Sequence, residues 1–123
     1  MFLQLNHKKL GIHQVVKDLV VETYRITAGF PSGEQFTLVI QIRRAVLSVH
    51  LNISEGSARR STNERLRFYE IARSSLVEVD AAFELANDLS FLQHIALDKL
   101  RQLIIKSFVM LTGLIHSTQQ STH

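Results

Sequence analysis

Four long segments of this sequence repeat their apolar residues every three or four positions, the spacing that places side chains on one face of an α-helix. Only one proline and five glycines interrupt the 123 residues, so few positions would break such helices. The expected helices cover residues 9–27, about 32–55, 62–89 and 95–116. Long helices joined by short connections predict an all-α fold, an antiparallel up-down-up-down four-helix bundle.

The chain is expected to form a single four-helix bundle domain over residues 1–123, with an ordered core at about 9–116 and a frayed tail at 117–123. It has no cysteine, so a disulfide framework is excluded. No apolar run approaches the roughly 20 residues of a membrane span, and no signal peptide is recognisable. These features predict a cytoplasmic protein with no membrane partner.

Signals for helix ends punctuate the pattern. In "NISEGSARRSTNE", residues 52–64, Gly56 is expected to end the second helix in a left-handed conformation. Ser61 with Glu64 three residues later is typical of a capping box that opens the third helix. Ser32 with Gln35 forms the same pattern before the second helix, although Pro31 could instead be its first residue. Residues 52–64 are therefore interpreted as a tight connection between antiparallel helices.

The second helix carries two apolar faces. One face would pack in the bundle core, and its members are Ile42, Val46, Val49 and Ile53. A second stripe lies about 60° to 120° around the helix when Val39 is set at 0°, nearly opposite the core face. It consists of Phe36, Ile40, Leu47 and Leu51. A helix of a monomeric bundle needs one apolar face, so the second stripe predicts an interface with another copy of the chain. Scattered exposed apolar residues, common on any protein surface, are the alternative.

Charge is segregated along the chain. Residues 41–73 contain seven arginines and three glutamates, whereas residues 74–98 contain five acidic residues and no lysine or arginine. The densest basic cluster lies at the expected turn between the second and third helices and consists of Arg59, Arg60, Arg65 and Arg67. It is the first candidate for binding nucleic acid, and the next candidates are Arg43, Arg44 and Arg73. Alternatively, Arg43 or Arg44 pairs with Glu70 or Glu78 across the helices.

The sequence lacks recognisable catalytic or metal-binding motifs. The six histidines are dispersed without metal-ligand spacing, and no HExxH, diiron or phosphate-cradling motif occurs. The serines of the third helix have no histidine within a turn. We therefore expect no enzymatic activity, no metal and no cofactor.

Several ordered motifs resemble one known family. They are "FP" at 30–31, "QIRRA" at 41–45, Ser48, "NISEG" at 52–56, Arg59 or Arg60, and "SLVEVD" at 75–80. Together they resemble the four-helix-bundle proteins of the 23S ribosomal RNA intervening-sequence family over about residues 9–116. The sequence departs from the family at His50, where proline is common, and in "SARRS", which lacks the usual aromatic or glycine residues.

The resemblance implies a homopentamer with faces of the second helix at its contacts. It also implies similarity to the accessory variability determinants of diversity-generating retroelements, basic pentamers that bind nucleic acid and a reverse transcriptase. The motif residues that we expect to be structural are Asn52, Glu55, Gly56 and Glu78. The predicted function is a non-enzymatic, oligomeric protein that associates with RNA or DNA. The alternative is a protein-interaction scaffold, for example a partner of a reverse transcriptase, that does not itself bind nucleic acid.

Overall fold

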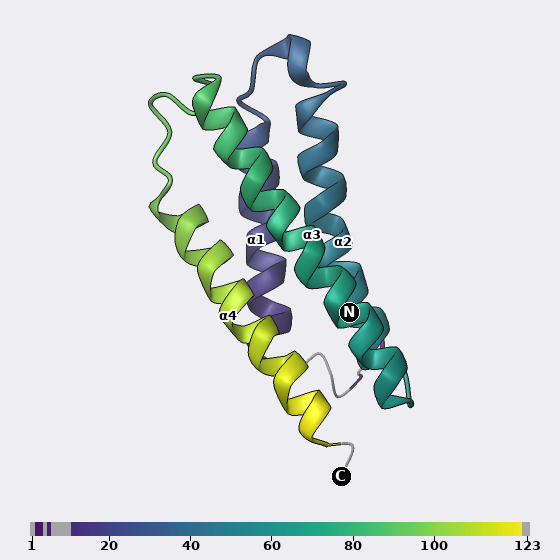
Figure 1. Cartoon of the computed structure of the whole chain (residues 1–123). Coiled ribbons are helices and arrows are strands. Elements are labelled where there is room, and N and C mark those ends of the chain that lie inside the picture. Colours follow the sequence, from purple (N-terminus) through teal and green to yellow (C-terminus); the bar gives the residue numbers. More distant parts are fainter. Residues whose placement is uncertain (1, 4, 6–10, 122–123) are drawn as a thin grey trace.

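The computed structural model describes residues 2, 3, 5 and 11–121, and within them the chain forms four α-helices and no β-strand. The elements are α1 (Gly11–Thr27), the short 3-10 helix η2 (Ser32–Glu34), α2 (Leu38–Ser57), α3 (Thr62–Asp88) and α4 (Asp98–Gln120). The turn between α2 and α3 lies at one end of the molecule, and the other two connections lie at the opposite end (Figure 1). The expected all-α fold with four helices is confirmed.

Each helix packs against its neighbours in sequence, and α1 also packs against α4. The contact between α2 and α3 is the most extensive of the four. All four helices contribute to one core, which includes Leu19, Ile42, Leu76 and Leu111, each at most 1% exposed. Burial of each such side chain stabilises the fold by about 1.5–3 kcal/mol relative to exposure.

Helix α3 begins where the sequence predicts. Ser61 is its N-cap, and the Ser61 hydroxyl accepts a hydrogen bond of 3.3 Å from the backbone N–H of Glu64. Helix α2 begins later than expected, at Leu38. Ser32 makes no side-chain cap and instead opens η2, whose backbone bonds run from Glu34 N to Pro31 O and from Gln35 N to Ser32 O. The chain therefore turns once more before α2 starts.

The predicted left-handed conformation of Gly56 is wrong. No glycine in the described part of the chain has a positive φ, and α2 continues through Gly56 to Ser57. A Cβ atom at Gly56 would lie 2.8 Å from Cε1 of Tyr69 and 3.0 Å from Cβ of Phe68. Gly56 is thus explained by the close approach of α3 to the last turn of α2, rather than by a helix stop.

The end of α4 also differs from the sequence-based expectation. The helix continues to Gln120, four residues beyond His116, so the expectation of a frayed tail is corrected for residues 117–120. Thr118 is buried there, and its hydroxyl donates a hydrogen bond of 2.7 Å to the Leu114 carbonyl. Residues 122 and 123, the end of the predicted tail, lie outside the described residues. Within the described part of the chain, no helix has the length and hydropathy that crossing a membrane requires.

Candidate functional site

The predicted basic cluster lies at the end of the bundle where α2 turns into α3. Arg59 does not face solvent freely: its guanidinium forms an ion pair with Glu55, one turn earlier on α2. The same guanidinium carbon lies 5.1 Å from the centre of the Phe68 ring on α3. Arg59 therefore contacts both helices at their turn, and the structural role expected of Glu55 stays a prediction.

The other three arginines of the cluster differ in their exposure. Arg60 and Arg67 are exposed, and neither belongs to the two ion pairs found among the described residues. Arg65 is half-buried, and its Nε lacks a hydrogen-bond partner. Of the four predicted residues, the cluster thus presents Arg60 and Arg67 as unpaired outward cations.

The arginines of α2 are divided in the same way. Arg43 packs against α1: its Nε donates a hydrogen bond of 3.0 Å to the Thr27 hydroxyl, and its guanidinium lies 4.5 Å from the centre of the Tyr24 ring. Arg44 is exposed and has no ion pair among the described residues.

The alternative pairing of Arg43 or Arg44 with Glu70 or Glu78 across the helices is therefore wrong within the described chain. Arg43 instead reaches α1, because it lies on the flank of α2 that faces Tyr24 and Thr27. Glu78 is exposed and has no ion pair there. Arg73, on α3, is half-buried without one.

A small polar seam joins α2 and α3 near their middle. The hydroxyls of Ser48 and Ser75 share a hydrogen bond of 2.8 Å, and Asn52 Nδ2 donates to the Ser48 carbonyl at 2.8 Å and to its hydroxyl at 3.0 Å. Closer to the turn, Ser57 and Tyr69 share a hydrogen bond of 2.9 Å between their hydroxyls. The Asn52 bonds run to Ser48 within α2, and the structural role of Asn52 stays a prediction. The partner of Ser48 was not foreseen, because a serine on a helix face does not reveal what it contacts.

The second apolar stripe of α2 is only partly a helical stripe. Ile40 and Leu47 are half-buried, and Leu51 is 60% exposed. Phe36 is 85% exposed but lies in the turn before Leu38, so its predicted place on the helical stripe is wrong. Three of the four predicted interface residues therefore share one outer face of α2, between the flank where Arg43 meets α1 and the flank where Ser48 meets α3.

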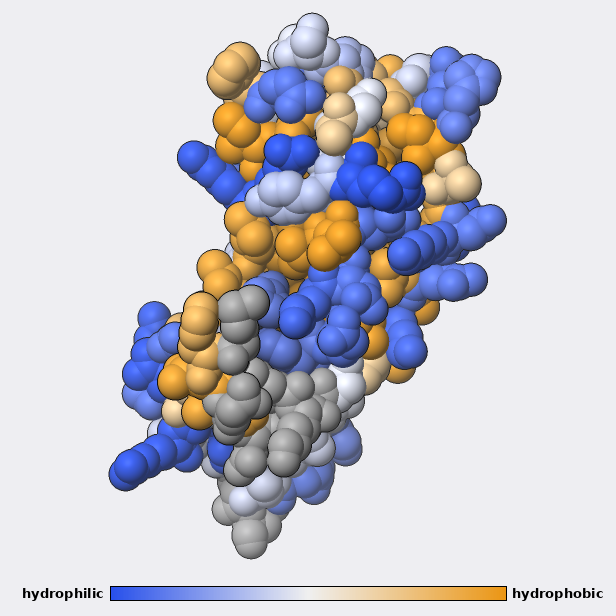
Figure 2. Space-filling model, turned by 180° about the vertical axis from the view of Figure 1, so that it is seen from behind, coloured by the Kyte–Doolittle hydropathy of each residue, from blue (hydrophilic) through white to orange (hydrophobic). Residues whose placement is uncertain are grey.

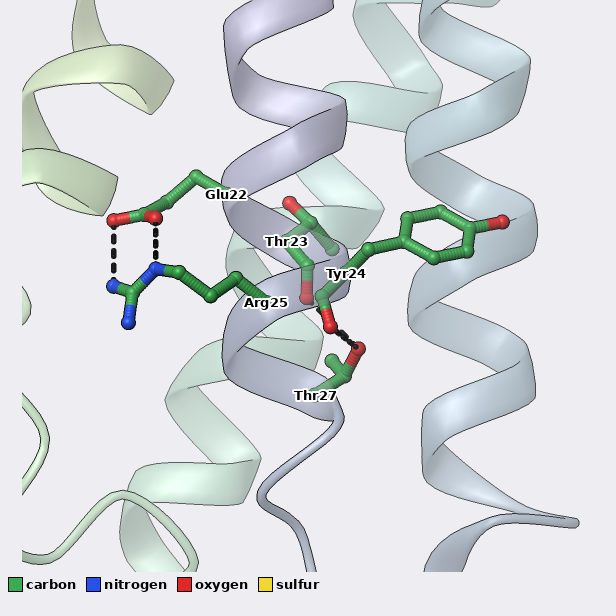
Figure 3. Close-up of polar contacts among 5 residues, drawn as sticks. All are labelled: Glu22, Thr23, Tyr24, Arg25 and Thr27. Carbon is green, nitrogen blue, oxygen red and sulfur yellow. Dashed lines mark hydrogen bonds and ion pairs between the residues drawn. The ribbon is translucent and has the colours of Figure 1, made fainter.

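Sequence reasoning missed a buried carboxylate on α1. Glu22 is 2% exposed, and Arg25 donates hydrogen bonds to its two carboxylate oxygens at 2.6 and 3.0 Å (Figure 3). These bonds hold the pKa of Glu22 below its usual value, although burial acts to raise it. The positive charge of Lys99 on α4 also lowers the pKa of Glu22. The detectable signal was the position of Glu22, three residues after buried Leu19 and three before Arg25.

Two histidines from different helices meet between α1 and α2. The ring centres of His13 and His50 are 5.0 Å apart, and His50 Nδ1 has no hydrogen-bond partner. Burial lowers the pKa of His50, and the nearby charge of Lys17 lowers it further. Both effects favour the neutral form of His50 over its protonated form.

The described residues contain no group of three or more histidine, cysteine, aspartate or glutamate side chains that could hold a metal ion. An open groove of about 580 Å³ follows the outer side of α3 and is lined by residues that include Asn63, Arg67, Glu70 and Glu78. Its basic end adjoins the cluster, and its other end is acidic. The groove and the cluster offer charged groups for binding.

Comparison with protein-family models matches residues 8–113 of the chain to one family, the 23S rRNA-intervening sequence proteins. The match spans most of the 123 residues and all of α1, α2 and α3. The chain belongs to this family. No curated protein matches the chain closely enough to count as a relative. The family assignment inferred from "QIRRA", "NISEG" and "SLVEVD" is confirmed.

Proposed function

We propose that this member of the intervening-sequence protein family is a non-enzymatic, homo-oligomeric protein built from antiparallel four-helix bundles. Its proposed ligand is RNA or DNA, bound at the end of the bundle where α2 turns into α3. The observation that carries the proposal is the pair Arg60 and Arg67, both exposed and without an ion pair among the described residues. Arginine recognises phosphate through its planar set of N–H donors.

The position of the pair favours an anionic ligand for a second reason. Arg60 precedes α3 by two residues and Arg67 lies in its second turn, so both are close to the amide end of a 27-residue helix. The partial positive charge at a helix N-terminus adds to that of the guanidinium groups. Phosphate contacts of this kind carry no base information, so little sequence preference is expected.

A homo-oligomer would turn one weak contact into several. In the part of the chain that the structure describes, Arg60 and Arg67 are exposed, unpaired cations at this end, and a ring of identical chains repeats them around an axis. The outer stripe of α2, Ile40, Leu47 and Leu51, is the proposed contact between copies. The pentameric number comes from the family resemblance.

The second candidate is a protein-interaction scaffold, with a reverse transcriptase or another protein as partner and no direct contact with nucleic acid. One observation favours it: Arg43 and Arg59 are used within the chain to join helices. If the remaining arginines only kept the protein soluble, then none of the predicted arginines would contact nucleic acid.

Fluorescence anisotropy with a labelled RNA and a labelled DNA, each at two salt concentrations, separates the candidates. We expect micromolar, salt-sensitive binding that weakens strongly in Arg60→Ala/Arg67→Ala, with a shallower salt dependence because fewer counterions are released. Arg59 is left in place, because its removal would also free Glu55.

The matched control is Lys17→Ala/Lys106→Ala, which removes the same charge from exposed positions on α1 and α4. It should bind nearly as the wild type does. Failure of the wild-type protein to bind either polymer at low salt would leave the scaffold as the function. Equal losses in both double variants would mean that net charge, rather than this end of the bundle, governs binding.

A further inference from the structure

An apolar groove runs between α3 and α4, on a different side of the bundle from the α2 stripe. Its volume is about 370 Å³, and it is lined by Leu76, Val77, Asp80, Ile104, Ile105, Phe108 and Val109. Val77, Ile105 and Val109 are more than half exposed, at 54%, 56% and 64%. Contact between water and such a cluster of large apolar side chains is unfavourable in free energy, and covering the cluster would remove that cost.

The same chain presents an apolar ridge on α2. Ile40, Leu47 and Leu51 lie along the outer face of α2 at intervals of seven and four residues, and Leu51 is 60% exposed. A ridge spaced in this way is the part of a helix that inserts into a groove between two other helices. The back of the molecule, opposite the α3 and α4 ribbons that lie in front in Figure 1, also shows apolar patches among hydrophilic ones (Figure 2).

The charges beside the two surfaces are complementary. Asp80 lies in the groove itself and also lines the adjoining hollow with Glu84 and one basic residue, Arg101, so carboxylates outnumber cations there. On α2, exposed Arg44 lies within about 60° of the ridge residues around the helix and has no ion pair among the described residues. An arginine beside the ridge would therefore meet the acidic wall formed by α3.

We propose that the α2 ridge of one copy inserts into the α3/α4 groove of a second copy. This proposal rests on the proposed homo-oligomer and specifies its contact. Because the ridge and the groove are different surfaces, the contact is heterologous: each copy uses its groove for one neighbour and its ridge for another. A symmetrical contact of ridge against ridge would leave the groove exposed and would stop at two copies.

Two interface-blocking variants test the pairing of these surfaces. Leu47→Glu disables the ridge and keeps the groove, whereas Ile105→Glu disables the groove and keeps the ridge. Each variant alone should be a monomer by native mass spectrometry. An equal mixture should form a heterodimer with one copy of each variant and no larger species, because only one intact ridge and one intact groove can meet.

Leu85→Glu is the control, since Leu85 is 50% exposed on α3 but does not line the groove. It should retain the wild-type oligomer, and circular dichroism should show that all three variants fold. An Ile105→Glu protein that keeps the wild-type oligomer, or a mixture that stays monomeric, overturns the ridge-in-groove contact while the homo-oligomer stands. A monomeric wild-type protein overturns both.

Discussion

Replacement of Gly56 by alanine tests how closely α2 and α3 approach one another. In an unconstrained helix, alanine is favoured over glycine by about 0.8–1 kcal/mol. At Gly56, however, the new Cβ would lie 2.8 Å from Cε1 and 3.0 Å from Cδ1 of Tyr69. Tyr69 is 3% exposed and its hydroxyl is bonded to Ser57, so the ring cannot swing away without losing that bond.

The clash should outweigh the gain in helix propensity. Overpacking of a close contact costs about 1–3 kcal/mol, and the gain in helix propensity offsets about 1 kcal/mol of it, so the net loss in the free energy of unfolding should be up to about 2 kcal/mol. For a chain of this length, a loss of that size corresponds to a fall in Tm of up to roughly 8 °C. Gly56→Val should lower Tm further, because its branched side chain brings two more carbon atoms to the same contact.

Gly113→Ala is the matched control. Gly113 is an exposed residue of α4, and a Cβ atom there meets nothing within 4 Å. This variant should raise Tm, since only the helix propensity changes. Thermal unfolding followed by circular dichroism, at one fixed protein concentration, measures all three variants. If Gly56→Ala raises Tm as Gly113→Ala does, then the helices are not in the close contact inferred here.

Two further substitutions address the buried ionisable groups. Because folding lowers the pKa of His50, the unfolded chain binds the proton more tightly, and the free energy of unfolding should fall as pH drops below about 6.5. Thermal unfolding of His50→Gln should show a smaller fall in stability between about pH 7.5 and 5.5 than the wild type shows. Arg25→Ala should lower the free energy of unfolding at neutral pH, because it leaves the Glu22 carboxylate without its hydrogen-bond partner. Adding Glu22→Gln should then recover part of that loss; a double variant less stable than Arg25→Ala would show that the carboxylate is not the source of the penalty.

The helical pattern was sufficient to predict the four helices and most of the core. Leu19, Ile42, Leu76 and Leu111 all fall on the inward phase of their segments, because burial and helical period act on the same positions. The start of α3 was equally visible, since the Ser61 cap is a local interaction between residues three apart. Local signals of this kind need no knowledge of neighbouring helices.

Features that depend on contacts between helices could not be predicted in the same way. Gly56 has the sequence context of a helix stop, yet a glycine is needed there because the Tyr69 ring, thirteen residues later, lies against it. Phe36 matched the period of the stripe, but the extra turn after Pro31 moved the start of α2 to Leu38 and placed Phe36 outside the helix. Period alone cannot place a residue that lies before the first turn of its helix.

The arginines illustrate why a count of charges overstates a binding surface. The guanidinium groups of Arg43 and Arg59 form contacts within the chain. In contrast, Arg44, Arg60 and Arg67 are exposed and have no ion pair among the described residues. If Arg44 faces the α3 wall of a neighbouring copy, then Arg60 and Arg67 are the exposed, unpaired arginines left for phosphate among the seven predicted. Two cations per chain give weak binding, so strong binding would depend on the number of copies presenting them together. A chain made monomeric by Leu47→Glu should therefore keep the individual contact and lose the affinity that comes from repeating it.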